Sequence, residues 1–135
     1  MTRGQRNHTP LNIRRSRGTR WLGQAAKQRD KEFVQFQCDL MGYRAAFRIM
    51  RTYINQYHLD TIKGIIYRWA PPEDGNLTTA YINIVSEHSG ISLNTAIRFD
   101  DEDTMVALIA AMARVESAIF NPDMRIIREA YNLAK

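Results

Sequence analysis

The feature that most limits the fold is a helical spacing of apolar residues that starts near Gly42. Apolar side chains recur at intervals of three and four residues from Ala46 to Tyr57. Arginines 44, 48 and 51 fall on the opposite face of the same helix. Because this spacing brings the apolar side chains together along one side, the sequence predicts a helical body from residue 42 onward.

Four further helices are predicted, and capping residues, glycines and prolines mark their ends. Asn121 is expected to cap the last one, with Pro122 as its first helical residue. The segment from Glu73 to Leu77 is read as a loop. The expected helices run, in chain order, from Asp60 to Pro71, from Thr78 to Ser89, from Asp100 or Asp101 to Val115, and from Asn121 to Tyr131.

The amino-terminal quarter has a different pattern. Residues 1–20 are polar and read as irregular, with a short ordered stretch at residues 11–13. The short segments 20–22 and 33–37 are rich in aromatic or β-branched residues, which favours a small hairpin. A chain of 135 residues suits one domain. The expected fold is therefore mainly α with a small β-hairpin, in a single domain spanning residues 1–135.

The charge is concentrated in that same quarter. Residues 1–31 carry nine lysines and arginines and one acid, a net +8, whereas the remaining residues carry a net −3. A dense basic segment suits an anionic partner, such as nucleic acid, anionic lipid or the carboxylate-bearing peptides of a bacterial wall. A solvated arm that only increases solubility is the alternative.

Several classes of protein lack support. No apolar run approaches the roughly 18 residues of a membrane span, and no secretory signal precedes Asn12, so synthesis in the cytoplasm is expected. The one cysteine, Cys38, is expected to be a small buried apolar residue. His8, His58 and His88 lack ligand spacing, so neither a metal site nor a cofactor is expected.

One residue is a candidate for chemistry. Glu116 follows an apolar helix and precedes the Asn121-Pro122 turn. A carboxyl group that is partly desolvated at such a helix end has a raised pKa and can act as a general acid on a glycosidic oxygen. The alternative is a surface glutamate paired with Arg114.

The segment from Leu108 to Pro122 resembles the catalytic-helix motif of lytic transglycosylases. In that motif a Glu-Ser pair follows an apolar helix and often precedes Phe-Asn-Pro. The matching residues here are Glu116-Ser117 and Phe120-Asn121-Pro122. This resemblance implies a lysozyme-like fold and a single catalytic glutamate, Glu116.

Other segments are similar to phage and prophage lysozyme-like proteins and to flagellar-type glucosaminidases. They are Asn7 to Arg14, Trp21 to Gly23, Phe33 to Phe36, Arg68 to Pro72 and Thr78 to Val85. In the usual transglycosylase the Glu-Ser helix comes first, whereas here it comes last. A circular permutation would reconcile the two orders, and it requires the Glu116 carboxyl to lie close to Asn12 and Tyr81.

The resemblance also implies roles for other residues. Asn12 and Tyr81 would hold the N-acetyl group or the developing charge, and Ser117 would be a further substrate-binding residue. Trp21, which is flanked by Arg20 and Gly23, is the better surface candidate for stacking on a sugar ring. Trp69 and Tyr53 are expected in the core instead, because they lie on apolar helical faces. The acids that could assist Glu116 are Glu73, Asp74 and Asp39.

Three functions remain open. The leading one is a peptidoglycan-cleaving glycosidase or lytic transglycosylase of phage or mobile-element type. The second is a non-catalytic virion or wall-binding protein with the same fold. The third is a nucleic-acid-binding domain that uses the arginines of residues 1–20, with an affinity that falls steeply as salt rises. The first two readings place the protein in a virion, or released to the cell wall, with other virion proteins as partners.

Overall fold

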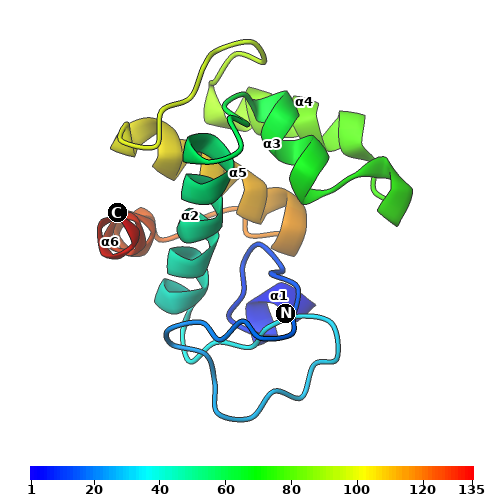
Figure 1. Ribbon diagram of the computed structural model, residues 1–135, viewed down its shortest axis with the longest axis vertical. Coiled ribbons are helices and arrows are strands. Elements are labelled where there is room, and N and C mark those ends of the chain that lie inside the picture. The colour runs from blue at the N-terminus through cyan, green and yellow to red at the C-terminus, as the bar shows by residue number, and fades with distance from the viewer.

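A computed structural model describes residues 1–135, and it is built mainly of helices (Figure 1). The predicted helical class is therefore confirmed. No helix combines the length and the apolar character needed to cross a bilayer. The bounds of the helices, in chain order, are α1 Arg3–Arg6, α2 Asp39–Asn55, α3 Ile62–Trp69, the 3-10 helix η1 Pro72–Asp74, α4 Thr78–Ser89, α5 Glu102–Ser117 and α6 Met124–Ala134.

Side-chain caps explain where three of the longer helices begin. The Thr61 hydroxyl accepts a hydrogen bond from the Gly64 amide at 3.1 Å, and the Asp101 carboxylate accepts one from the Thr104 amide at 3.3 Å. The last helix is capped by Asp123, 3.0 Å from the Arg125 amide. The predicted cap at Asn121 is therefore wrong. The Asp123 carboxylate is nearer the helix and accepts the hydrogen bond from the free amide. The negative charge of Asp123 also suits the positive end of the helix dipole.

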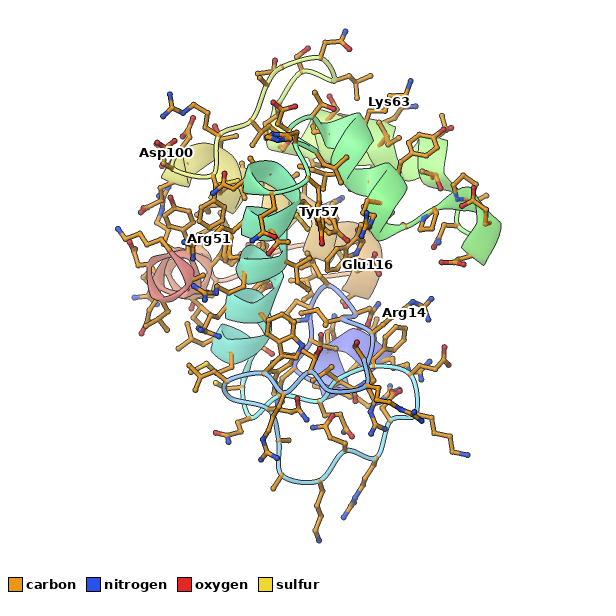
Figure 2. The ribbon with its side chains drawn as sticks, viewed as in Figure 1. Arg14, Arg51, Tyr57, Lys63, Asp100 and Glu116 are labelled. Atoms are coloured by element: carbon orange, nitrogen blue, oxygen red, sulfur yellow. The ribbon has the colours of Figure 1, made fainter.

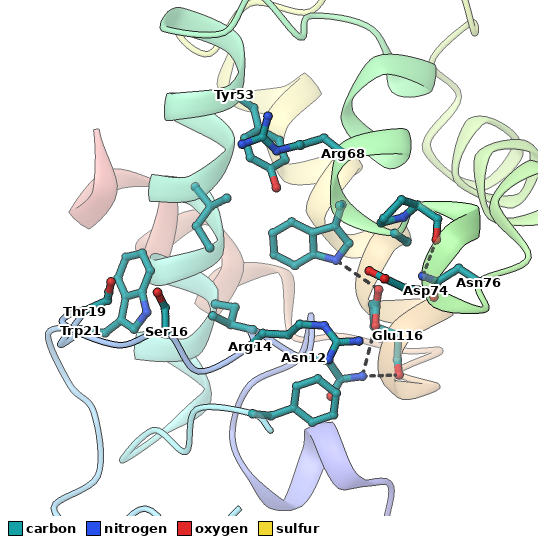
Figure 3. Close-up of a pocket in the computed structure, with 16 residues that line it drawn as sticks. Asn12, Arg14, Ser16, Thr19, Trp21, Tyr53, Arg68, Asp74, Asn76 and Glu116 are labelled. Carbon is teal, nitrogen blue, oxygen red and sulfur yellow. Dashed lines mark hydrogen bonds between the residues drawn. The ribbon is translucent and has the colours of Figure 1, made fainter. Parts of the chain in front are cut away.

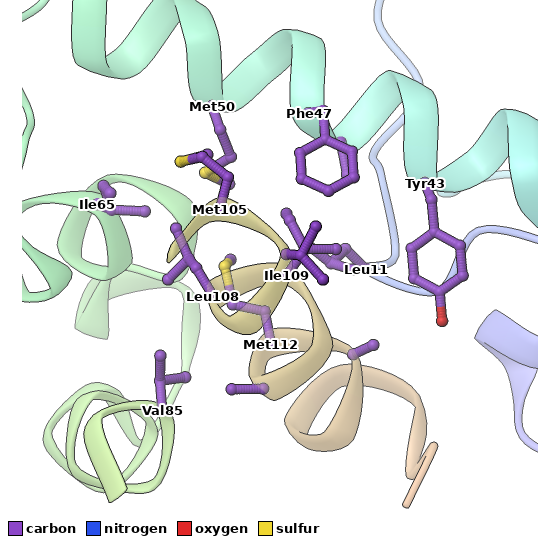
Figure 4. Packing of buried hydrophobic residues seen from close by; sticks show 14 of the residues in the cluster. Leu11, Tyr43, Phe47, Met50, Ile65, Val85, Met105, Leu108, Ile109 and Met112 are labelled. Carbon is purple, nitrogen blue, oxygen red and sulfur yellow. The ribbon is translucent and has the colours of Figure 1, made fainter. Parts of the chain in front are cut away.

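Helix α5 forms the centre of the core (Figure 4). It packs against α4 and α6, and α2 packs along α6. Side chains from α2, α3 and α4 close around the buried face of α5, and each fully buried large side chain contributes about 1.5–3 kcal/mol. The fully buried side chains of this centre include Phe47, Met50, Ile65, Val85, Met105, Leu108, Ile109 and Met112.

The predicted hairpin does not form. The amino-terminal quarter has only two isolated antiparallel bridges, Arg14 with Phe33 and Gln24 with Phe36. Side-chain amides take the backbone groups that a ladder would use. The Gln28 side chain accepts from the Gln35 amide and donates to the Ala25 carbonyl, both at 2.8 Å, so only the bond from the Ala25 amide to the Gln35 carbonyl remains between these two residues. Asp30 Oδ1 also accepts from the amide of Phe33 at 2.9 Å, so the ladder does not extend beyond the isolated bridges.

The first residues are also more ordered than predicted. Thr2 caps the short helix α1 in a capping box with Gln5. This helix packs against the carboxyl end of α5. The ordered stretch expected at residues 11–13 includes two core residues, Leu11 and Ile13, which are 1% and 3% exposed. The start of the chain is therefore part of the folded body.

Cys38 is exposed, which corrects the expectation that it is buried. It follows the buried residues Val34 and Phe36 in an alternating pattern, and that pattern predicts an inward side chain. The alternation ends at Cys38 because this residue is the N-cap of α2, where extended backbone gives way to helix.

Candidate functional site

A cleft of about 540 Å³ separates the amino-terminal quarter from the helical body (Figure 3). Residues 12–21 and Phe33 form one wall, and residues of α2, α3 and the η1 loop form the other. Glu116 contributes a carboxyl group from the end of α5. The lining residues are Asn12, Ile13, Arg14, Ser16, Thr19, Trp21, Phe33, Ile49, Tyr53, Arg68, Trp69, Ala70, Pro71, Asp74, Asn76 and Glu116.

Glu116 lies in the last turn of α5, and three side chains hold its carboxyl group. The Asn12 amide nitrogen donates to Oε1 at 3.2 Å. The Trp69 indole nitrogen and the Tyr81 hydroxyl both donate to Oε2, at 3.1 and 2.9 Å. The donors come from the amino-terminal quarter, α3 and α4, so the carboxyl group is fixed where these elements meet.

The amino-terminal segment anchors the end of α5. The Thr2 hydroxyl and the Gln5 side-chain amide both donate to the Ser117 carbonyl at 2.8 Å. The Ser117 hydroxyl in turn donates to the Pro10 carbonyl at 2.7 Å. These bonds satisfy groups that a helix end leaves free. Gly4 allows this close approach, because a Cβ at that position would collide with the Ser117 side chain.

Asn12 is held in an unusual conformation. Its φ of 54° lies in the left-handed region, where asparagine is tolerated better than most residues. Its side-chain nitrogen also donates to the Glu116 carbonyl at 3.0 Å, so one amide bridges the backbone and the side chain of Glu116. Asn12 Oδ1 is buried without a hydrogen-bond partner. Burying that oxygen costs stability, which the two bonds to Glu116 offset.

Burial raises the pKa of Glu116 above that of an ordinary glutamate. The donors from Tyr81, Asn12 and Trp69 oppose this shift, and so does the charge of Arg14, but burial outweighs them. Burial also raises the pKa of Tyr81 well above its usual range, so this hydroxyl stays protonated and remains a donor.

The bonding pattern favours one oxygen of Glu116 over the other as the place for a proton. Oε2 already accepts from two donors, Trp69 and Tyr81. Oε1 accepts one longer bond from Asn12. A proton is therefore accommodated best on Oε1, and the site can present a neutral carboxylic acid to a ligand in the cleft.

One curated protein aligns with most of this chain. It is Protein P5 of Pseudoalteromonas phage PM2, which is 41% identical over 117 residues. The alignment covers 85% of this chain and 71% of that protein. The chain belongs to the P5 family. A scan against models of protein families finds no match.

In this member of the P5 family, the residues predicted for the site are only partly brought together. Asn12, Trp21, Asp74 and Glu116 line the cleft. Tyr81 is 6% exposed and reaches Glu116 from behind the cleft wall.

Three other predicted residues lie outside the cleft lining. Ser117 is buried and binds Pro10, so it positions α5. Glu73 is exposed on η1. Asp39 pairs with His8 at 2.8 Å at the start of α2. Elsewhere, too, no three His, Cys, Asp or Glu side chains gather as metal ligands would.

Sequence reasoning missed several residues of the cleft. Trp69 and Tyr53, which are expected in the core, are half-buried against it and also line the cleft, where their rings meet edge to face at 6.3 Å. Arg14, Phe33 and Arg68 lie in the resembling segments, but no role in the site is predicted for them. Apolar spacing shows which face of a helix is buried. An aromatic residue at the edge of that face has the same spacing in the sequence whether it packs in the core or lines a cleft.

Proposed function

We propose that this chain is a peptidoglycan-cleaving glycosidase or lytic transglycosylase of phage type, with Glu116 as the general acid. The observation that carries the proposal is the buried, raised-pKa carboxyl group of Glu116 in an aromatic-lined cleft. A glycosidic bond breaks when its oxygen receives a proton as the bond to the sugar carbon lengthens. A carboxyl group whose pKa is raised by burial keeps such a proton to higher pH than an ordinary glutamate does.

Each neighbour of Glu116 has a part in this reaction. Protonated Oε1 gives its proton to the leaving oxygen, and the carboxylate that forms accepts from Asn12, Trp69 and Tyr81. In a transglycosylase the sugar's own 6-hydroxyl attacks the anomeric carbon and returns its proton to the Glu116 carboxylate, so no second acid is needed. In a hydrolase a water attacks instead and gives its proton to Asp74, the other acid that lines the cleft.

Two observations support the lysozyme-like relationship. The Glu116 carboxyl lies within hydrogen-bond distance of Asn12 and Tyr81, as the circular permutation requires. The P5 relative comes from a phage, which suits a wall-cutting protein carried by a virion. Virion association and wall glycan as substrate are parts of the same proposal.

One observation favours a non-catalytic alternative. Both oxygens of Glu116 already accept hydrogen bonds from the protein, an arrangement that also suits a purely structural carboxylate. A virion or wall-binding protein would use the same cleft to hold glycan without cutting it.

Clearing of purified peptidoglycan distinguishes the two. Glu116→Gln keeps the shape of the side chain and removes the acid, so it should abolish clearing. Glu87→Gln, a matched change on the exposed face of α4, should leave clearing intact. Circular dichroism verifies folding, and Glu116→Ala replaces the Gln variant if that variant does not fold. Undiminished clearing by a folded Glu116 variant, or no clearing by the wild type, contradicts the proposed activity.

A further inference from the structure

Alternate residues of one amino-terminal segment face opposite ways. The outward ones are three exposed cations, Lys27, Arg29 and Lys31. The two residues between them, Gln28 and Asp30, are less exposed and are held by hydrogen bonds to the protein. The Gln28 side chain donates to the Gln35 carbonyl at 2.7 Å, and Asp30 accepts from the Asn7 side chain at 2.9 Å. The three cations therefore lie in a row along one side of the chain.

Arg15 extends this row from a second segment. Its backbone amide donates to the Glu32 carbonyl at 2.7 Å, and its guanidinium donates to the Asp30 carbonyl at 2.8 Å. The Asp30 carbonyl lies between Arg29 and Lys31 in the chain, so the Arg15 guanidinium lies beside them. A carbonyl does not neutralise the charge. We refer to these four cations as the basic row: Arg15, Lys27, Arg29 and Lys31.

The acids closest to the basic row are engaged elsewhere. Both oxygens of Asp30 accept from Arg3 at 2.6 Å, and the Asp30 side chain is 9% exposed. Glu32 contacts Arg3 at 3.3 Å and Arg14 at 3.7 Å. No member of the basic row takes part in an ion pair. Its charge therefore remains available to a partner, whereas Arg3, one of the arginines of residues 1–20, is used inside the fold.

The shape of the basic row indicates which anion it suits. Members two positions apart in the chain have Cα atoms at most about 7 Å apart, so their charges follow one another along a line. A nucleic acid strand presents its phosphates as such a line. An anionic bilayer presents them over a plane, and proteins on its surface also insert apolar side chains. The residues between the cations of segment 27–31 are polar and turned inward, which favours the nucleic acid.

The aromatic residues of this quarter indicate a duplex instead of a single strand. Proteins that hold single strands stack the unpaired bases on aromatic side chains. Trp21 and Phe33 line the cleft, and Phe36 is buried, so none of them lies exposed beside the basic row as a stacking platform. The bases of a duplex are already stacked, so contact with its phosphates is sufficient.

We infer that the basic row binds the phosphate backbone of double-stranded nucleic acid without reading its bases. Guanidinium and ammonium groups both donate to phosphate oxygens, and each neutralised phosphate releases condensed counterions. The four residues lie outside the lining of the cleft. This second site therefore goes beyond the proposed cleavage of wall glycan and does not depend on it.

The salt dependence of binding tests this inference. The full chain is titrated into a short fluorescein-labelled DNA duplex, and fluorescence anisotropy gives the affinity at several salt concentrations. Four neutralised phosphates predict a slope of about −3.6 for log K against log salt, at about −0.9 for each phosphate. The affinity should then fall roughly a hundredfold between about 50 and 200 mM salt. A duplex of shuffled sequence should bind equally well.

Two triple variants locate the binding. Lys27→Gln/Arg29→Gln/Lys31→Gln leaves one cation of the basic row and should reduce the slope to about −0.9. Its matched control, Arg51→Gln/Lys63→Gln/Lys135→Gln, also removes one arginine and two lysines, all exposed. Figure 2 shows Arg51 and Lys63 on the helical body and Arg14 in the amino-terminal quarter. The control should keep the wild-type slope although its net charge falls equally.

The inference is overturned if the duplex does not bind at low salt, if the first triple variant keeps the wild-type slope, or if the control lowers the slope as much. Tighter binding of a single strand of the same sequence also overturns it. So does binding to phosphatidylserine vesicles without binding to the duplex, which would assign the basic row to a membrane surface. Circular dichroism verifies folding, and single variants, each expected to reduce the slope by about 0.9, replace a triple that does not fold. Failure of the proposed activity is distinct, because wall clearing would be absent while the duplex still bound.

Discussion

Asn12 and Glu116 are 104 residues apart in the sequence, yet one amide nitrogen of Asn12 donates to both the carbonyl and Oε1 of Glu116. This contact joins the basic amino-terminal quarter to the central helix. It explains why residues that read as a polar arm are ordered, because the end of α5 depends on them for hydrogen bonds. The site is thus built across the junction of the two parts.

Replacing Asn12 tests that junction. Asn12→Gly and Asn12→Ala both remove the amide and should lower wall clearing roughly hundredfold, since a displaced acid loses its alignment. The alanine variant should also be about 1 kcal/mol less stable than the glycine variant, because φ is positive here. His8→Ala is the control, at φ 53° and without a bond to Glu116. Full clearing by either Asn12 variant would show that the bridge is dispensable.

The pKa of Glu116 predicts a pH dependence of stability. Because burial raises it, the folded state holds this proton more tightly than the unfolded chain, and stability falls as pH rises. The loss begins near the ordinary value of 4.5 and is complete above the raised pKa of the folded protein. Chemical denaturation across this window should show wild type losing stability relative to Glu116→Gln. A constant difference between the two proteins would refute the raised pKa.

The hydrogen bond from the Trp69 indole should lower the pKa of Glu116. Trp69→Phe removes a donor that lowers the pKa of Glu116, so that pKa should rise further. The alkaline limit of the wall-clearing profile should move to higher pH, and the Glu116 carboxyl carbon should titrate later in an NMR experiment. Trp21→Phe, in the same cleft but without a bond to Glu116, should shift neither. If both variants behave alike, the indole hydrogen bond has no such effect.

The turn after the acid has a strained residue. Ala118 caps α5 at φ 54° and ψ 39°, a left-handed conformation that glycine adopts more easily. Ala118→Gly should therefore raise the free energy of unfolding by about 0.5–1 kcal/mol in urea denaturation. The same change at Ala107, inside α5, should lower it by a similar amount. A loss of stability at Ala118 would contradict this assignment of strain.

The sequence predicts the helical body well, because apolar spacing and caps act locally. Helix α4 begins at Thr78 and ends at Ser89, as expected, and the long helix is capped by Asp101. The last cap is misplaced by two residues, since Asn121 and Asp123 are both suitable and only the folded chain decides between them. The hairpin is not formed for a similar reason, because the Gln28 side chain takes the Gln35 amide and the Ala25 carbonyl, two groups that would otherwise pair.

The candidate site is predicted in part. The resemblance drew attention to Glu116, Asn12 and Tyr81, and the structure brings these three together. Trp69 lies in the resembling segment Arg68 to Pro72, but its helical position is equally suited to the core, so no contact with Glu116 is predicted for it. The two arginines of the cleft are missed for another reason. Arg14 and Arg68 lie 54 positions apart in the sequence, so only the folded chain places them in one cleft.

The most direct test of the account is mass spectrometry of the soluble products from purified peptidoglycan. Wild-type protein should release glycan fragments that end in a 1,6-anhydro sugar if it is a transglycosylase, or in a reducing sugar if it is a hydrolase. Glu116→Gln should release neither, while Glu87→Gln should match the wild type. Equal release by folded Glu116→Gln, or no fragments from the wild type, would contradict the central claim that Glu116 cleaves wall glycan.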